Sequence, residues 1–64
     1  MNGSNLHVVP KGFWWAVKKE GTGKASRVFS NKWIAADYAL HKAKKSHDCV
    51  IAHERNGRIK SVEC

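Results

Sequence analysis

The residues best suited to metal or nucleophilic chemistry gather in the second half of the chain: His41, His47, Cys49 and His53. A structural zinc site usually takes four ligands, with cysteines paired as C-x₂₋₄-C and histidines as H-x₃₋₅-H. Cys49 has no second cysteine close to it, because the other one is Cys64 at the last position. The spacing therefore predicts no metal site and no other cofactor, and it favours histidines that are solvated or packed on a sheet.

Enzymatic motifs are equally weak. Asp48 adjoins Cys49, but neighbouring residues of a strand point to opposite faces, so this pair does not activate a thiol. The segment Gly21–Ser26 (GTGKAS) resembles a phosphate-binding loop, yet Lys18 stands where that motif needs its first glycine and Ala25 stands where it needs Ser or Thr. No pair of carboxylates is spaced for acid–base work. We expect a protein that is not an enzyme.

Charge is the most informative property of the composition. Twelve Lys and Arg residues face five acidic residues, which gives a net charge of +7 on 64 residues. Like charges on so small a body repel one another, so the excess indicates a partner of opposite sign, either nucleic acid or an acidic protein. No apolar run approaches the ~20 residues that a membrane span needs. We interpret the two cysteines as reduced thiols and expect a cytoplasmic protein.

The elements that position these residues form one domain over residues 1–64, with a frayed polar start at 1–5. A helix is predicted over Asn31–Ser46, which is rich in Ala, Leu and Lys and contains no Gly or Pro, with Ser30 as its N-cap. Asn56-Gly57 predicts a type I′ hairpin turn. The pattern and the turn signals Lys11-Gly12 and Glu20–Lys24 predict strands at Leu6–Pro10, Phe13–Lys19, Ala25–Phe29, Cys49–Arg55 and Arg58–Val62.

This order, β-β-(β)-α-β-β, predicts an α+β fold in which a small antiparallel sheet of four to five strands carries one helix on one face. The opposite face of the sheet then has nothing in the chain to cover it. On the helix, one side gathers the residues expected to pack on the sheet: Trp33, Ala36, Ala39, Leu40 and Ala43. Strand alternation assigns Phe13, Trp15 and Val17 to the same core.

Three segments together resemble a known family: HVVP at His7–Pro10, WAVK at Trp15–Lys18 and VIAHERNGRI at Val50–Ile59, in this order around an alanine-rich helix. The chain is similar over nearly its whole length to a family of small uncharacterised bacterial and phage proteins, classed as a domain of unknown function. The resemblance implies the fold just described and a phage or prophage origin. It implies no activity.

Two functions follow as expectations. The first is nucleic-acid association through backbone phosphates, with a base stacked on Trp14; its predicted residues are Trp14, Lys18, Lys19, Arg55, Arg58 and Lys60. The alternative is a protein-interaction module, for instance a phage-encoded modulator that docks on an acidic host protein, through Ile34, Tyr38, Lys42 and Lys45. Two simpler interpretations stay open: Trp14 only covers the sheet as a hydrophobic side chain, and the lysines only form a solvated surface. Either function suits a monomer or a homodimer.

Overall fold

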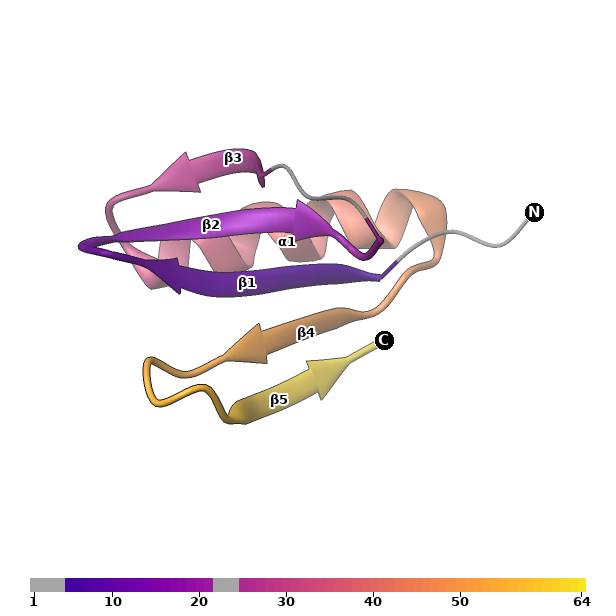
Figure 1. Ribbon diagram of the computed structural model, residues 1–64. Helices are drawn as coiled ribbons and strands as arrows, with labels where there is room; N and C mark the ends of the chain where they lie inside the picture. The colour runs from indigo at the N-terminus through magenta and orange to yellow at the C-terminus, as the bar shows by residue number, and fades with distance from the viewer. Residues whose placement is uncertain (1–4, 22–24) are drawn as a thin grey trace.

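The computed structural model describes residues 5–21 and 25–64 as a sheet of five strands with one helix, and it confirms the predicted α+β class and element order (Figure 1). Most of the polar start, residues 1–4, and residues 22–24 of the second turn lie outside the described part. The elements are β1 (Leu6–Lys11), β2 (Trp14–Lys19), β3 (Ala25–Phe29), α1 (Lys32–Ser46), β4 (Val50–His53) and β5 (Ile59–Glu63). Asn5 is not frayed, since its carbonyl accepts the N–H of Glu20 at 2.8 Å.

The strands lie in the order β3-β2-β1-β4-β5. Three neighbouring pairs are antiparallel, but β1 and β4 are parallel, with Leu6 opposite Val50 and Val8 opposite Ala52. The sheet is therefore mixed rather than wholly antiparallel. The reason is the connection: the chain leaves β3, crosses through α1 and enters beside β1 in the same direction, which a long crossover allows and a hairpin does not.

Small side chains bring the helix close to the sheet. Ala35, Ala39 and Ala43 are buried at the contact, against a core of Leu6, Val8, Val17 and Val50. The predicted packing side was correct for Ala39 and Ala43, while Leu40 is half-buried. It was wrong for Trp33, which is 72% exposed, and it missed Ala35. An indole ring does not fit a contact built from methyl groups, so the helix turns Ala35 inward instead.

The first hairpin explains a second error. The β1–β2 ladder runs up to the pair Lys11 and Trp14, so Gly12 and Phe13 form the two-residue loop between them. Gly12 adopts φ +63, which suits glycine. Phe13 is 91% exposed at this loop and does not belong to the core, whereas Trp15 packs on the core and Val17 is fully buried, as predicted.

The helix ends at Ser46 as predicted, but its start differs from the prediction. Asn31, not Ser30, is the N-cap of α1: its side-chain oxygen accepts the N–H groups of Trp33 at 2.7 Å and Ile34 at 3.3 Å. An Asn side chain reaches the second and third N–H groups of the helix as a Ser does. After the last residue of the helix, His47 takes the left-handed conformation, with φ 59, and its backbone N–H donates to the carbonyl oxygen of Ala43.

The second hairpin is confirmed, but its turn type is not. In the turn between β4 and β5 only Gly57 has a positive φ, +89, so the turn is not type I′, which needs a positive φ at Asn56 too. The N–H of Gly57 donates to Glu54 at 2.9 Å and the N–H of Glu54 donates to Arg58 at 2.7 Å. This is the pattern of a three-residue loop that ends on a left-handed glycine.

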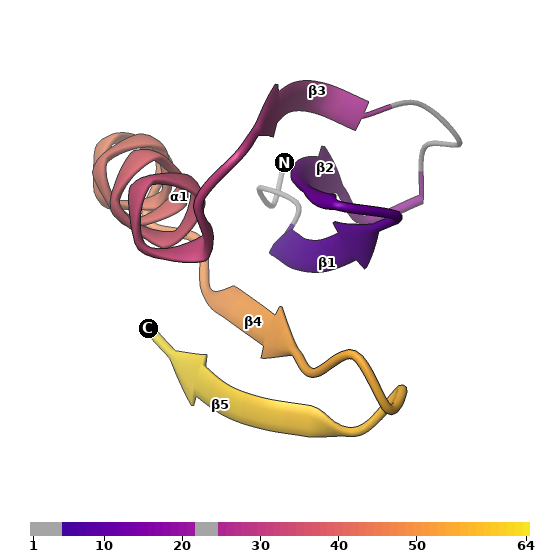
Figure 2. The same cartoon turned by 90° about the vertical axis from the view of Figure 1, so that its left-hand side faces the viewer.

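One face of the sheet carries α1 and the other carries no element among the described residues, as Figure 2 shows. By the strand registers, this uncovered face presents Trp14, Val28, Ile51, Ile59 and Val62 together with His7, Lys18 and His53. Within the described residues, no helix is long and apolar enough to cross a membrane.

Candidate nucleic-acid interface

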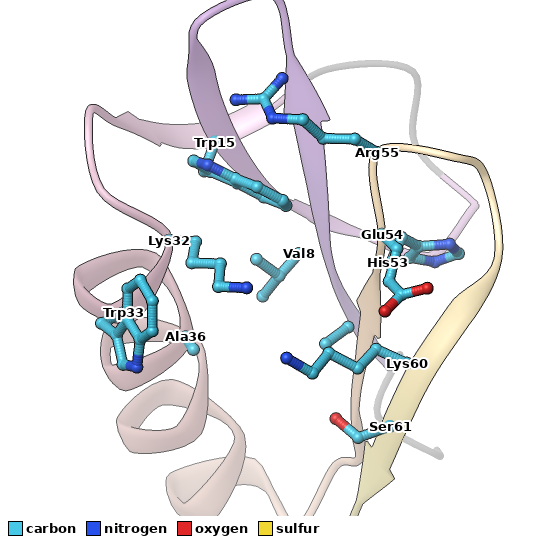
Figure 3. A pocket seen from close by; sticks show the side chains of 11 residues that line it. Val8, Trp15, Lys32, Trp33, Ala36, His53, Glu54, Arg55, Lys60 and Ser61 are labelled. Atoms are coloured by element: carbon cyan, nitrogen blue, oxygen red, sulfur yellow. The ribbon is translucent and has the colours of Figure 1, made fainter.

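A hollow of about 580 Å³ opens on the helix side of the sheet, between the start of α1 and the β4–β5 hairpin (Figure 3). Three connections meet at this end of the molecule: the β1–β2 loop, the β3–α1 link and the β4–β5 turn (Figure 1). The hollow is lined by Val8, Trp15, Lys32, Trp33, Ala36, Ala52, His53, Glu54, Arg55, Lys60 and Ser61. Two indole rings and three cationic side chains thus share one concave surface.

Trp15 is the fixed wall of the hollow. The Arg55 guanidinium lies 5.0 Å from the centre of its ring, and Nη1 of Arg55 donates to the carbonyl of Gly12 at 2.5 Å. A guanidinium over an indole face is an attractive cation–π contact. Arg55 therefore joins the β4–β5 turn to the β1–β2 loop and keeps its charge at the rim.

Lys32 lies between the two indole rings. Its ammonium is 4.9 Å from the ring centre of Trp33 and 5.9 Å from that of Trp15. The Asn31 cap sets this arrangement, because it fixes the first turn of α1, from which Lys32 and Trp33 project. Trp33 forms the outer rim of the hollow, and 72% of the residue is exposed to solvent. An exposed ring beside an ammonium offers a surface for stacking and a charge for an anion.

The β5 strand supplies the facing wall with Lys60 and Ser61. Figure 3 shows the ammonium ends of Lys32 and Lys60 pointing into the hollow from opposite sides, with the Ser61 hydroxyl below them. The acidic side chain of the lining is Glu54, against the cations Lys32, Lys60 and Arg55. The arrangement suits an anionic group in the middle and a flat ring at the edge.

The predicted nucleic-acid residues fall on separate surfaces. Arg55 and Lys60 line the hollow. Trp14 and Lys18 lie on the uncovered face, as the alternation in β2 predicted, and Lys19 ends β2 opposite Leu6. Arg58 is exposed in the β4–β5 turn. The structure thus does not bring Trp14 together with Arg55 and Lys60.

Of the aromatic and cationic side chains that line the hollow, the predicted site residues did not include Trp15, Lys32 and Trp33. The first and third were assigned wholly to the core, because a hydrophobic pattern does not distinguish a buried indole from one that lines a surface. The sequence does place Lys32 and Trp33 side by side near the predicted start of the helix, a cation beside an aromatic ring, and this pair was the available signal.

The predicted protein-interaction residues are only partly available. Ile34 is exposed, and so are Lys42 and Lys45. Tyr38 is half-buried and packs on the core: its ring centre lies 5.3 Å from that of Phe29, and its hydroxyl accepts from Nζ of Lys42 at 3.5 Å. Ile34 therefore lacks the exposed aromatic neighbour that the hypothesis gave it.

The uncovered face holds a chain of titratable side chains. His7 Nδ1 lies 2.8 Å from His53 Nε2, and His7 Nε2 lies 2.9 Å from the Glu20 carboxylate. Burial, then the nearby charges of His7 and Lys18, lower the pKa of His53. In the part of the chain that the structure describes, no three His, Cys, Asp or Glu side chains are grouped so that they could hold a metal ion.

The interpretation of the cysteines as reduced thiols is wrong. Cys49 and Cys64 form a disulfide, with their Cα atoms 4.1 Å apart. The physical reason is the ladder: β4 and β5 pair Val50 with Glu63, and the next pair outward is Cys49 with Cys64. The expected cytoplasmic location loses this support, because disulfides persist mainly in oxidising compartments.

The fold and the hollow define a class: a small basic α+β domain with an aromatic, cationic surface cavity. Residues 6–63 match the profile of a family described as an uncharacterized protein conserved in bacteria (DUF2188). The chain belongs to this family, as the resemblance in its motifs predicted. No curated protein and no solved structure matches the chain.

Proposed function

We propose that this protein is a small non-enzymatic binding module that associates with nucleic acid through the phosphate backbone. The observation that carries the proposal is the convergence of Lys32, Arg55 and Lys60 on a hollow that also contains two indole rings. Proteins that hold nucleic-acid strands combine a basic groove with aromatic platforms. The net charge of +7 acts in the same direction, because it attracts a polyanion at long range.

The test is fluorescence anisotropy with labelled single-stranded and duplex oligonucleotides over a series of salt concentrations. Loss of one phosphate contact should reduce the slope of log affinity against log salt by ~0.7 for a single strand and ~0.9 for a duplex. Lys60→Ala should show this reduction. Lys45→Ala, which removes the same charge at the far end of α1, should leave the slope nearly unchanged. Absence of binding to either oligonucleotide at low salt would eliminate the proposal.

A protein-interaction module is the second candidate, and the uncovered face favours it. Trp14, Val28, Ile59 and Val62 are exposed there, an apolar surface beside the cation of Lys18. Such a surface suits an acidic partner with apolar side chains of its own. A phage-encoded modulator of a host protein, a cytoplasmic location and a monomeric or dimeric state all stay predictions. Trp14→Ala separates the candidates, since it should weaken protein docking and spare binding at the hollow.

A further inference from the structure

We infer that the hollow accepts one unpaired nucleotide, with its phosphate between Lys32 and Lys60 and its base stacked on Trp33. This inference rests on the proposed function and narrows it from nucleic acid in general to single strands.

The position of the phosphate follows from the two ammonium groups. Lys32 projects from the first turn of α1 and Lys60 from β5, and both ends point into the same hollow (Figure 3). The Ser61 hydroxyl lines the same space and offers a hydrogen bond to a phosphate oxygen. Arg55 contacts the Trp15 ring and donates to the Gly12 carbonyl at the rim, where its charge adds positive potential to the entrance.

The position of the base follows from the difference between the two indole rings. Trp15 is partly buried and has cations near it, with Arg55 at 5.0 Å and Lys32 at 5.9 Å from its ring centre. Trp33 contacts Lys32 alone among these and is 72% exposed. Of the two rings, Trp33 is therefore the one that a flat ligand can cover, directly beside the phosphate position.

Single strands are favoured because bases inside a duplex are already stacked on both sides. A duplex base would have to leave its stack before it could cover Trp33, and this costs a few kcal/mol. An unpaired base loses no such stacking. In proteins that bind single strands, each base stacked on an aromatic side chain adds to the affinity, and it does so for any base because every base has a π-face. The hollow is thus expected to prefer single strands without preferring a sequence.

The experiment compares a labelled oligothymidylate with a blunt duplex of equal charge, in wild type and in two tryptophan variants. Trp33→Ala should weaken oligothymidylate binding about 5- to 150-fold, the range of one lost base–aromatic stack, while Trp33→Phe retains most of the affinity. Trp14→Ala is the matched control, because it removes an exposed indole from the opposite face of the sheet. Circular dichroism confirms that each variant is folded.

The outcomes distinguish this inference from the proposed function. If wild type binds single strand and duplex with equal affinity and Trp33→Ala changes neither affinity, the inference that a base stacks on Trp33 is overturned. The proposal that the protein binds phosphates then still stands. Competition by poly-glutamate as effective as competition by unlabelled oligothymidylate also overturns it, because a base then has no role. Failure of wild type to bind any oligonucleotide at low salt removes both. A Trp33-dependent preference for the single strand supports the inference.

Discussion

His7 of β1 and His53 of β4 form a hydrogen bond between ring nitrogens 2.8 Å apart, across the parallel strand pair that joins the two hairpins. The Glu20 carboxylate only accepts, so Nε2 of His7 carries a proton. In neutral His7 the other nitrogen is then an acceptor, and His53 must donate from Nε2. If His7 gains a proton it donates at both nitrogens, and the hydrogen bond is kept with Nε2 of His53 as the acceptor. If both histidines are protonated, two N–H groups face each other and the hydrogen bond is lost.

The hydrogen-bonded side chains His53, His7 and Glu20 lead us to predict that the protein loses stability in acid. The pKa of His53 is lowered in the folded protein by burial and by the charges of His7 and Lys18, whereas in the unfolded chain it titrates near ~6.5. Below that pH the unfolded chain binds more protons, so acidification favours unfolding until the lower folded pKa is passed. Thermal unfolding followed by circular dichroism should show Tm falling as the pH drops through about 6.5.

The control for this prediction is a pair of histidine substitutions. His53→Gln should flatten the pH dependence of Tm, because the group with the lowered pKa is gone. His41→Gln, at an exposed position of α1 away from His7 and His53, is the control and should retain the fall in Tm with acid. If His53→Gln and wild type lose the same Tm between neutral pH and pH ~5, the His7–His53 pair is not the source of the acid sensitivity.

A second prediction concerns the disulfide. Every residue of β5 is exposed, and among the described elements β5 does not pack against α1. Its attachments are the β4 ladder and the Cys49–Cys64 bond, which joins residues 15 positions apart in the sequence. Reduction, or Cys64→Ser, should lower the free energy of unfolding by up to about 3 kcal/mol on a loop-entropy estimate. Urea unfolding with and without a phosphine reductant measures this directly.

The variant is also the control, because Cys64→Ser should be insensitive to the reductant. Identical urea midpoints for oxidised and reduced wild type would contradict the prediction. Lys60 and Ser61 belong to the same strand. Reduction should therefore also weaken oligonucleotide binding at the hollow.

The fold was predictable from local patterns, and the hollow was not. The helix pattern and the hairpin signal at Asn56-Gly57 are both local, and both led to the correct elements. The hairpin register also contained the disulfide, since pairing Val50 with Glu63 sets Cys49 against Cys64. That step needed no structure and was missed.

The site depends instead on contacts between distant parts of the chain. Trp15 and Trp33 meet the same ammonium only because α1 starts beside the β1–β2 loop. Whether an indole at either position is buried or lines a surface is decided by where α1 packs. Ala35 and Ala36 point about 100° apart on the helix. Which of them turns toward the sheet depends on the rotation of α1 about its own axis, and the periodicity of the sequence does not fix that rotation.

A third prediction tests the helix cap that positions the hollow. Asn31→Ala removes the oxygen that accepts the N–H groups of Trp33 and Ile34. It should lower the free energy of unfolding by about 1 kcal/mol. Asn31→Asp is the control, because it keeps the acceptor and adds a negative charge at the positive end of the helix dipole. If Asn31→Ala unfolds at the wild-type urea concentration, Asn31 does not stabilise the helix start.

The last prediction tests the small-residue contact between α1 and the sheet. Ala39 is fully buried at the centre of that contact, between Ala35 and Ala43. Ala39→Leu adds atoms where the helix already touches the sheet, and such overpacking typically costs ~1–3 kcal/mol. Lys44→Leu makes the same side chain at an exposed position of the same helix. Urea unfolding should show that Ala39→Leu is less stable than wild type and that Lys44→Leu is close to wild type. Equal stabilities of the two variants would mean that the helix packs on the sheet through another side.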